Sequence, residues 1–282
     1  MKCNNKHWVC PADTPILVPC GKCLPCLSNK RTEWIIRLEE EQKVSSSSYF
    51  VTLTYSERYL PRTTGLSKRH LQLFFKRLRK TEKNLRYYAV GEYGTQKQRA
   101  HYHIILFNLK DVENLRKCWT HPKTKEDIGI VHVGNVTQAS IAYTTKYIIQ
   151  KGNAQTGNLN PPFQIMSRGY GLGAHYLSDN VIRYHRDSQI TYYMDYAVKK
   201  RLPRFYKEKI WPRVKGIYLG ATDWNYIRDR VSKKQKKIAE QQEMKNFDIL
   251  LAEGYNPDTI QAEMRSAAEG RISVKTSYSQ TL

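Results

Sequence analysis

The order of hydrophobic and polar residues predicts a chain of alternating helices and strands over its first 151 residues. Apolar residues recur at helical spacing, with Ser67 and Thr137 as N-caps of the second and last helix, in residues 28–42, 67–80, 111–119 and 137–151. Runs rich in β-branched and aromatic residues predict strands at residues 49–55, 86–92, 99–107 and 128–133. From residue 49 onward the order is strand-helix-strand-strand-helix-strand. This is the order of a ferredoxin-like α+β fold, an antiparallel sheet with helices on one face.

A pair of histidines lies on one face of the third predicted strand. Successive side chains of a strand point to opposite faces, so His101 and His103 share a face while the other face is apolar. A polar loop joins residues 86–92 to residues 99–107, and the resulting antiparallel hairpin brings Glu92 beside His101. Two imidazoles and a carboxylate suit Mg²⁺ or Mn²⁺ with positions left for a substrate phosphate. The alternative is a core histidine pair and an exposed turn carboxylate.

The last predicted helix carries two phenols and an ammonium group on one face. Tyr143, Lys146 and Tyr147 follow the spacing i, i+3 and i+4, which makes them neighbours on a helix surface. The apolar residues of the same helix form the other face. Tyrosines at this spacing either pack against a core or take part in chemistry, and the helix alone does not decide between the two.

The composition indicates a polyanionic partner. The chain has 282 residues, 40% of them hydrophobic, and no apolar run near the roughly 18 residues of a membrane span, which predicts a soluble protein of one or two domains. Its 47 Lys and Arg against 25 Asp and Glu give a net charge of +22, which favours nucleic acid. The 20 tyrosines favour stacking on unpaired bases. Candidate DNA contacts are cations of residues 67–80 and of the glycine-rich loop 167–173, unless they only form a solvated face: Lys68, Arg69, Lys76, Arg77 and Arg168.

Five of the six cysteines lie in the first 26 residues. No apolar segment of a signal peptide follows Met1, so we expect a reducing compartment, where a metal site is favoured over disulfides. Cys20, Cys23 and Cys26 form two overlapping Cys-x-x-Cys spacings that present three thiolates to one tetrahedral ion. A structural Zn²⁺ needs a fourth ligand, expected to be Cys3, with Cys10 and His7 as alternatives. Free thiols at the start of a helix are the competing interpretation.

The sequence divides into three predicted regions. Residues 1–45 form a Cys-rich segment and a helix, residues 46–200 a catalytic core, and residues 201–282 a basic, mainly helical C-terminal extension. Residues 190–193 are expected to add a short strand, and residues 151–162 to form a loop. The lysine-rich end of the chain is either a solvated helix or an electrostatic arm.

Four motifs in order carry a resemblance to a known family: Cys20-x-x-Cys23-x-x-Cys26 followed by Asn29-Lys30-Arg31 and Trp34, residues 50–55, Gly91-Glu92-Tyr93-Gly94 leading into His101-Tyr102-His103, and Tyr143-x-x-Lys146-Tyr147. Together they resemble the HUH endonucleases of rolling-circle replication, specifically the replication initiators of gokushovirus-type microviruses, which are small single-stranded DNA phages. The resemblance spans residues 20–151 and names no motif in the C-terminal extension.

This resemblance implies an HUH endonuclease core in which Glu92, His101 and His103 bind the metal. It also implies that Tyr143 and Tyr147 are paired nucleophiles, with Lys146 beside them. The expected activity is nicking of single-stranded phage DNA at the replication origin through a 5′-phosphotyrosyl intermediate, followed by rejoining into circles. The expected location is the host bacterial cytoplasm, without membrane partners. Because no Gly-x-x-x-x-Gly-Lys helicase signature is present, host helicase and polymerase are expected to assist.

Two other functions fit part of the sequence. A non-catalytic single-stranded nucleic-acid-binding protein with a zinc module accounts for the charge and the aromatic residues. It gives no reason for Glu92, His101 and His103 to converge. A related relaxase or single-strand transposase would share the chemistry and differ in biological role.

Overall fold

A five-stranded antiparallel sheet forms the centre of the computed structural model, which describes residues 3–9, 16–94, 97–150, 158–195 and 198–212 and scattered residues between 233 and 256. The strand order is β6-β3-β5-β4-β7. The strands are β3 (Ser48–Leu53), β4 (Arg86–Tyr93), β5 (Ala100–Phe107), β6 (Val131–Asn135) and β7 (Phe163–Met166). The predicted α+β class with an antiparallel sheet and flanking helices is confirmed, and β7 is an edge strand that the sequence pattern did not predict.

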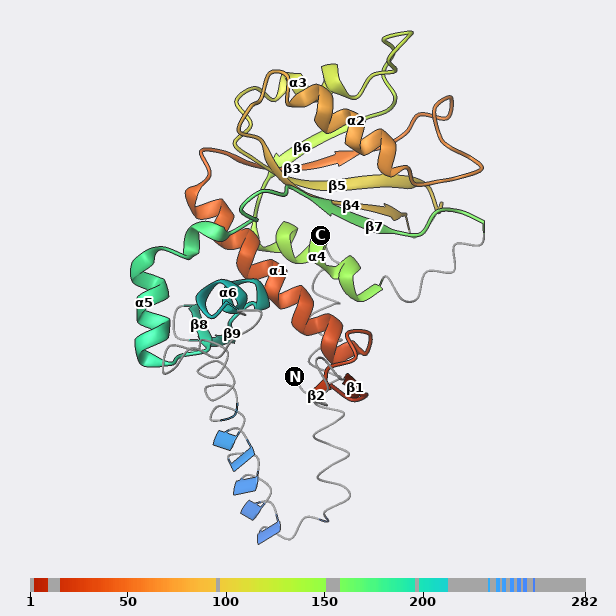
Figure 1. Ribbon diagram of the computed structural model, residues 1–282. Helices are drawn as coiled ribbons and strands as arrows, with labels where there is room; N and C mark the ends of the chain where they lie inside the picture. Colours follow the sequence, from red (N-terminus) through yellow and green to blue (C-terminus); the bar gives the residue numbers. More distant parts are fainter. Residues whose placement is uncertain are drawn as a thin grey trace.

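Helices cover both faces of this sheet (Figure 1). On one face lie α2 (Lys68–Leu78) and α3 (Glu113–Cys118), and on the other lie α4 (Gln138–Gln150) and α1 (Leu24–Val44). The element order β3-α2-β4-β5-α3-β6 is the ferredoxin-like order. The expectation of helices on a single face is wrong, because α4 and the helix before β3 fold back under the sheet.

Alternation along β5 supplies residues to two cores. Tyr102, Ile104 and Leu106 are fully buried against α2, where Leu71 and Phe74 meet them. The α2 helix begins as predicted, with the Ser67 side chain accepting a hydrogen bond from the His70 amide. This core fixes which face of β5 is apolar and leaves the histidine face for α4.

The second core holds α4 between the sheet and α1. Leu38 of α1 and Ile141 of α4 are fully buried with Ile105 and Phe107 of β5. Tyr147 packs against the same cluster, so the tyrosine side of α4 is packed too. The prediction of one apolar and one polar face for this helix is therefore only partly right, since α4 is covered on two sides.

The C-terminal elements pack against the opposite side of α1. They are a 3-10 turn, η2 (Ala174–Tyr176), then α5 (Asp179–Ser188), a hairpin of β8 (Tyr192–Asp195) and β9 (Val198–Arg201), and α6 (Arg204–Ile210). Ile36 of α1 is buried with Tyr206, Ile210 and Trp211. The short strand expected at residues 190–193 is present as β8, and residues 204–210 form a helix that the sequence analysis missed.

The glycine-rich loop 167–173 packs on α1. Gly173 has a positive φ of 71°, and a Cβ there would lie 2.4 Å from the Arg37 carbonyl oxygen, so the close approach requires glycine. Its amide donates to Glu41, which also pairs with Arg86 inside the protein. The loop backbone therefore has a structural role. Arg168 remains exposed.

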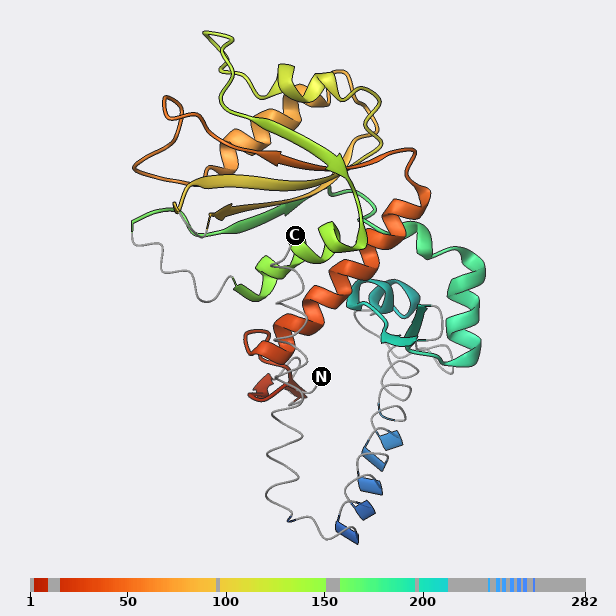
Figure 2. The same cartoon turned by 180° about the vertical axis from the view of Figure 1, so that it is seen from behind.

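The N-terminal residues form a small hairpin at the beginning of α1, visible from both sides of the molecule (Figures 1 and 2). Its strands are β1 (His7–Val9) and β2 (Ile16–Val18). Two predicted boundaries shift: α1 begins at Leu24 instead of residue 28, and β6 spans Val131–Asn135 instead of residues 128–133. None of the helices in the described part of the chain has the length and apolar character needed to span a bilayer.

Candidate active site

The hairpin β4-β5 sets the position of the predicted metal ligands. In its register Glu92 pairs with His101 and Val90 with His103. Residues paired directly across an antiparallel ladder point to the same face, and so do residues two apart along one strand. Glu92, His101 and His103 therefore share the face that α4 covers. The convergence expected from the sequence is present in the structure.

The three ligand groups meet at one carboxylate oxygen. Glu92 Oε1 lies 2.7 Å from His101 Nε2 and 2.9 Å from His103 Nε2. The second oxygen, Oε2, is buried and has no hydrogen-bond partner among the described residues. A buried carboxylate oxygen without a partner is unfavourable, and a cation at this point would satisfy it. Two imidazole nitrogens and a carboxylate fit a divalent cation that keeps open positions.

Hydrogen bonds on the far side of each ring orient the imidazoles. His101 Nδ1 lies 3.0 Å from the Arg99 carbonyl oxygen, which can only accept, so Nδ1 carries the proton. His103 Nδ1 lies 3.0 Å from Thr52 Oγ1. Both Nε2 atoms consequently face Glu92. Such outer partners are the usual way in which metal-binding histidines are held.

Burial and mutual pairing set the protonation of this group. Burial opposes ionisation of Glu92, but hydrogen bonds from the two histidines outweigh it and lower the pKa of the carboxyl. Burial acts against the charged form of His101, yet its bond to Glu92 raises the pKa overall. For His103 burial dominates and lowers the pKa. The carboxylate is thus ionised at neutral pH, as a metal ligand must be.

The tyrosines of α4 lie directly beside the three ligand groups. Tyr143 donates a hydrogen bond to Glu92 Oε1 at 3.4 Å, and its hydroxyl is also 3.4 Å from His103 Nε2. Tyr147, one helical turn later, donates to the Tyr143 hydroxyl at 3.2 Å. The two phenols therefore form a short chain that leads away from Glu92, with Tyr143 nearer to it.

Lys146 adds a positive charge to the two rings. Its ammonium nitrogen lies 3.9 Å from the ring centre of Tyr143 and 5.1 Å from that of Tyr147. Burial lowers the pKa of Lys146. Burial, and then the Glu92 charge, raise the pKa of Tyr143 above its ordinary value. The protein groups alone therefore do not generate a phenolate at neutral pH.

Two supporting residues of the site were missed by the sequence analysis. Phe50 stacks on the His103 ring with centroids 5.4 Å apart, and Thr52 holds Nδ1 of the same histidine. Alternation in the strand 49–55 places Phe50 and Thr52 on one face, which is a usable signal. The register that sets them beside β5 is long-range, and no local pattern indicates it.

The predicted DNA-binding cations do not gather around this site. Lys68, Arg69 and Lys76 are exposed on α2, on the opposite side of the sheet, and the Arg77 side chain donates to the Cys118 carbonyl. They can contact DNA only at a distance from the histidines. Lys234 and Lys236 of the C-terminal extension lie outside the described residues.

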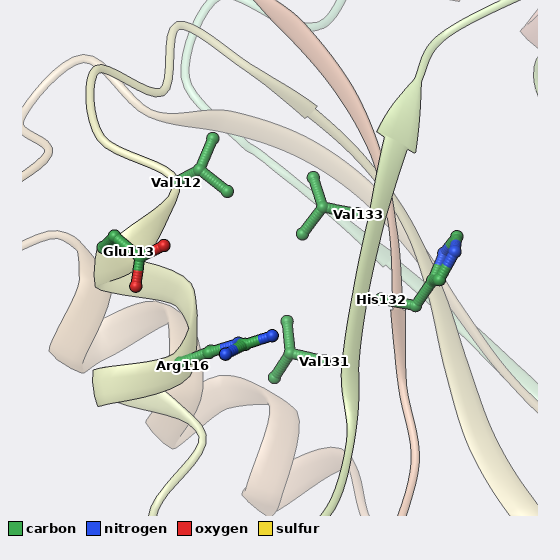
Figure 3. A pocket seen from close by; sticks show the side chains of 6 residues that line it. All are labelled: Val112, Glu113, Arg116, Val131, His132 and Val133. Atoms are coloured by element: carbon green, nitrogen blue, oxygen red, sulfur yellow. The ribbon is translucent and has the colours of Figure 1, made fainter.

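A surface hollow between α3 and β6 lies on this same far side of the sheet (Figure 3). Val131 and Val133 point into it opposite Glu113 and Arg116, whereas the His132 side chain points the other way. His132 is exposed, in the strand register next to Thr52. The hollow is therefore separate from the Glu92 site.

Known proteins provide an independent comparison. Residues 48–152 match a family model of the replication-associated protein ORF2. The replication-associated protein ORF2 of Spiroplasma virus 4 is 28% identical over 249 residues, 79% of this chain and 74% of that protein. The replication-associated protein VP4 of Bdellovibrio phage phiMH2K is 27% identical over 262 residues, 81% of this chain and 76% of that protein. The replication-associated protein ORF4 of Chlamydia phage 1 is 28% identical over 48% of this chain and 38% of its own length.

The matched segment contains the whole of the site described above, from Phe50 to Tyr147. The resemblance to phage replication proteins that the four motifs indicated is confirmed by these relatives. Through residues 48–152, the chain belongs with the phage replication-associated proteins of the ORF2 family.

Proposed function

We propose that the chain is a metal-dependent, site-specific endonuclease and strand transferase of the HUH type, which initiates rolling-circle replication of single-stranded phage DNA. The observation that carries the proposal is the Tyr143 hydroxyl, 3.4 Å from both Glu92 Oε1 and His103 Nε2. A phenol in contact with a set of metal-ligand groups is the arrangement needed for a tyrosine to attack a phosphate bound at the same point. The similarity to replication-associated proteins supports the biological role.

In the proposed reaction Tyr143 attacks one phosphodiester of the bound strand. A bond forms between phosphorus and the phenolic oxygen as the bond between phosphorus and O3′ breaks. The 3′-oxygen gains a proton, and the phenol has lost one. The products are a 5′-phosphotyrosyl link and a free 3′-OH. Because one phosphodiester replaces another, the reverse reaction can rejoin the strand.

Glu92, His101 and His103 would hold Mg²⁺ or Mn²⁺. When bound, the cation supplies Lewis-acid stabilisation of charge on the scissile phosphate and favours the phenolate. Thr52 and the Arg99 carbonyl keep the two imidazoles aimed at the same point. Lys146 faces the phenol rings and stabilises negative charge that develops on the tyrosine oxygen and the phosphate.

Tyr147 provides the second nucleophile in this proposal. After one round of synthesis a new origin must be cut while the first 5′ end is still bound to Tyr143. A second hydroxyl 3.2 Å from the first can take the new strand, so that cutting and rejoining alternate between the two tyrosines. Host helicase and polymerase would separate and extend the strands.

A covalent-adduct assay tests the proposal. The chain is incubated with labelled single-stranded DNA from the genome that encodes it and with Mg²⁺ or Mn²⁺, then denatured and separated on a gel. We expect a denaturation-resistant protein-DNA adduct that disappears in the Tyr143→Phe, Tyr147→Phe double variant while DNA binding persists. No adduct in the wild type would favour a non-catalytic binding protein, and an unchanged adduct in the double variant would exclude these nucleophiles.

A further inference from the structure

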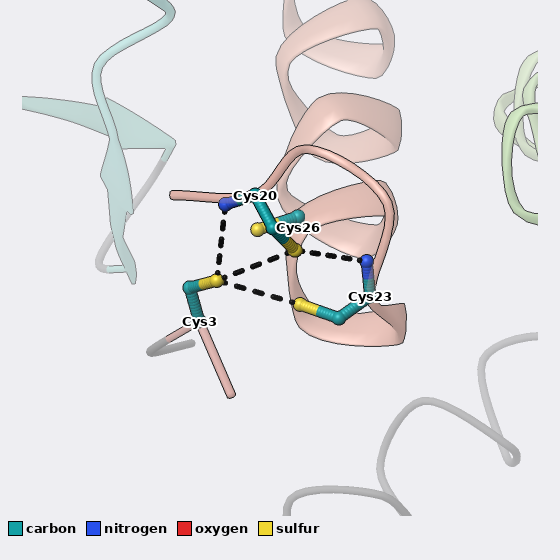
Figure 4. A group of neighbouring side chains, drawn as sticks. All are labelled: Cys3, Cys20, Cys23 and Cys26. Carbon is teal, nitrogen blue, oxygen red and sulfur yellow. Dashed lines mark hydrogen bonds between the residues drawn. The ribbon is translucent and has the colours of Figure 1, made fainter. Parts of the chain in front are cut away.

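Four cysteine side chains meet at the beginning of α1, away from the histidines and tyrosines of the candidate active site. Cys3 approaches from the N-terminal segment, Cys20 and Cys23 from the turn before the helix, and Cys26 from its first turn (Figure 4). Their sulfur atoms all lie within 4.8 Å of one another. The fourth thiol is thus Cys3. His7 lies exposed on β1, and Cys10 is outside the described residues.

The distances between the sulfur atoms match a single tetrahedral ion. Cys3 Sγ lies 3.5 Å from Cys20 Sγ and 3.7 Å from Cys23 Sγ. A zinc-sulfur bond of about 2.3 Å in a tetrahedron places two sulfurs about 3.8 Å apart. A disulfide requires about 2.05 Å, so these pairs are not bonded to each other. In a four-iron cluster each sulfur binds a different iron, which would set the sulfurs much farther apart.

Backbone amides are arranged to stabilise thiolates at this point. The amides of Lys22 and Cys23 donate to Cys20 Sγ at 3.4 and 3.3 Å, and the amide of Cys20 donates to Cys3 Sγ at 3.2 Å. Hydrogen bonds to the charged form favour that form. Cys23 is also the N-cap of the 21-residue helix α1, whose N-terminal dipole favours negative charge. Metal binding requires thiolates, and the local backbone favours them.

Apolar packing does not hold the N-terminal hairpin in place. None of the described residues 3–9 and 18–23 is buried, and Trp8 of β1 is 66% exposed. Each strand of the hairpin has only three residues, and an isolated two-stranded hairpin is marginally stable at best in water. Segments without a core of their own depend on disulfides or a metal. The four thiols are the group that joins this hairpin to α1.

We propose that Cys3, Cys20, Cys23 and Cys26 bind one structural Zn²⁺ ion that fastens the N-terminal hairpin to the first turn of α1. The proposal is independent of the nuclease chemistry, because the cluster contributes no side chain to the Glu92 site. Its mechanical effect reaches α4 through α1. One turn after the cluster, Arg31 of α1 donates to the Ala142 carbonyl of α4 at 2.8 Å, next to Tyr143.

Metal analysis of the full chain tests the site. The protein is purified without chelators, and zinc is counted by elemental analysis and by its release when a mercurial reagent blocks the thiols. We expect one zinc per chain in the wild type and in the His101→Ala, His103→Ala double variant. We expect at least a tenfold loss in Cys23→Ser and in Cys3→Ser. Cys118→Ser, which makes the same change at a buried thiol outside the cluster, is the matched control and should keep its zinc.

Replacement of zinc by Co²⁺ identifies the ligands without any variant, so the test stands even if a cysteine variant fails to fold. Four thiolates give intense tetrahedral visible bands and thiolate-to-metal charge transfer. A wild-type chain that neither contains zinc nor shows the cobalt bands would overturn the proposal. So would zinc that persists in Cys3→Ser and Cys23→Ser, zinc lost equally from Cys118→Ser, or iron in place of zinc.

Discussion

Tyr143 and Tyr147 should contribute unequally to the first cleavage. The Tyr143 hydroxyl touches Glu92 Oε1 and His103 Nε2, whereas Tyr147 reaches them only through the Tyr143 hydroxyl. Replacing Tyr143 by Phe leaves Tyr147 as the only phenol of the pair, farther from the phosphate by about the length of one hydrogen bond. A misplacement of about 1 Å can lower a rate roughly 100-fold. We therefore expect Tyr143→Phe to slow the first cleavage at least about 100-fold, equivalent to about 2.7 kcal/mol.

The matched change at Tyr147 should have a much smaller effect. Tyr147→Phe removes one hydrogen bond to the Tyr143 hydroxyl and keeps the packing of the ring against the core of α4 and β5. A typical net hydrogen bond contributes about 1 kcal/mol, so the first cleavage should slow by about fivefold. Rejoining of a second strand end, in contrast, should be lost in this variant.

Single-turnover kinetics separate the two expectations. Enzyme in excess over labelled single-stranded DNA is mixed with Mn²⁺, and the covalent adduct is followed over time in the wild type and both variants. The DNA affinity of each variant is measured without metal as a control for folding and binding. If Tyr143→Phe formed the adduct at nearly the wild-type rate while Tyr147→Phe did not, the geometric argument would be refuted.

Three further expectations concern stability, pH and DNA contact. Leu38 is fully buried between α1 and the sheet, so Leu38→Ala should lower the free energy of unfolding by about 2–5 kcal/mol in denaturant titrations, whereas Leu24→Ala, at a site 38% exposed, should stay within about 0.5 kcal/mol. Burial lowers the pKa of Lys207 to about 8, so the native chain binds fewer protons than the unfolded chain between that pH and about 10.4, and wild-type stability relative to Lys207→Met should rise across this range in thermal denaturation, while a fall would contradict it. Replacing three exposed α2 cations by Gln should reduce the salt dependence of single-stranded DNA binding by about 0.7 per cation, about 2 in total, and leave the cleavage rate at saturating DNA unchanged, because α2 packs on the far face of the sheet: Lys68, Arg69 and Lys76. A slower cleavage step at saturation would place these cations at the active site instead.

Local patterns were sufficient to predict the arrangement of the candidate site. Strand alternation puts His101 and His103 on one face, and the short connection between β4 and β5 fixes a register in which Glu92 meets His101. Helical spacing puts Tyr143, Lys146 and Tyr147 together. These relations hold within about ten residues along the chain, which is the range over which periodicity constrains geometry.

Features that depend on distant contacts were missed. The edge strand β7 (Phe163–Met166) has no strong alternation of its own, and it is a strand because it pairs with β4. The position of α4 under the sheet follows from packing against α1, which was read as a helix with a single buried side. Ile36 and Leu38 of α1 in fact serve two different cores. Propensity and pattern give way to tertiary packing at such positions.

A Mn²⁺-soaked crystal of the wild-type chain, measured at the manganese absorption edge, tests the central claim most directly. We predict an anomalous difference peak within bonding distance of Glu92, His101 Nε2 and His103 Nε2, beside the Tyr143 hydroxyl. The peak should vanish in a His101→Ala, His103→Ala crystal soaked in the same way. Manganese bound elsewhere on the chain, with these three side chains still paired only to each other at saturating Mn²⁺, would contradict the proposed metal-assisted tyrosine chemistry.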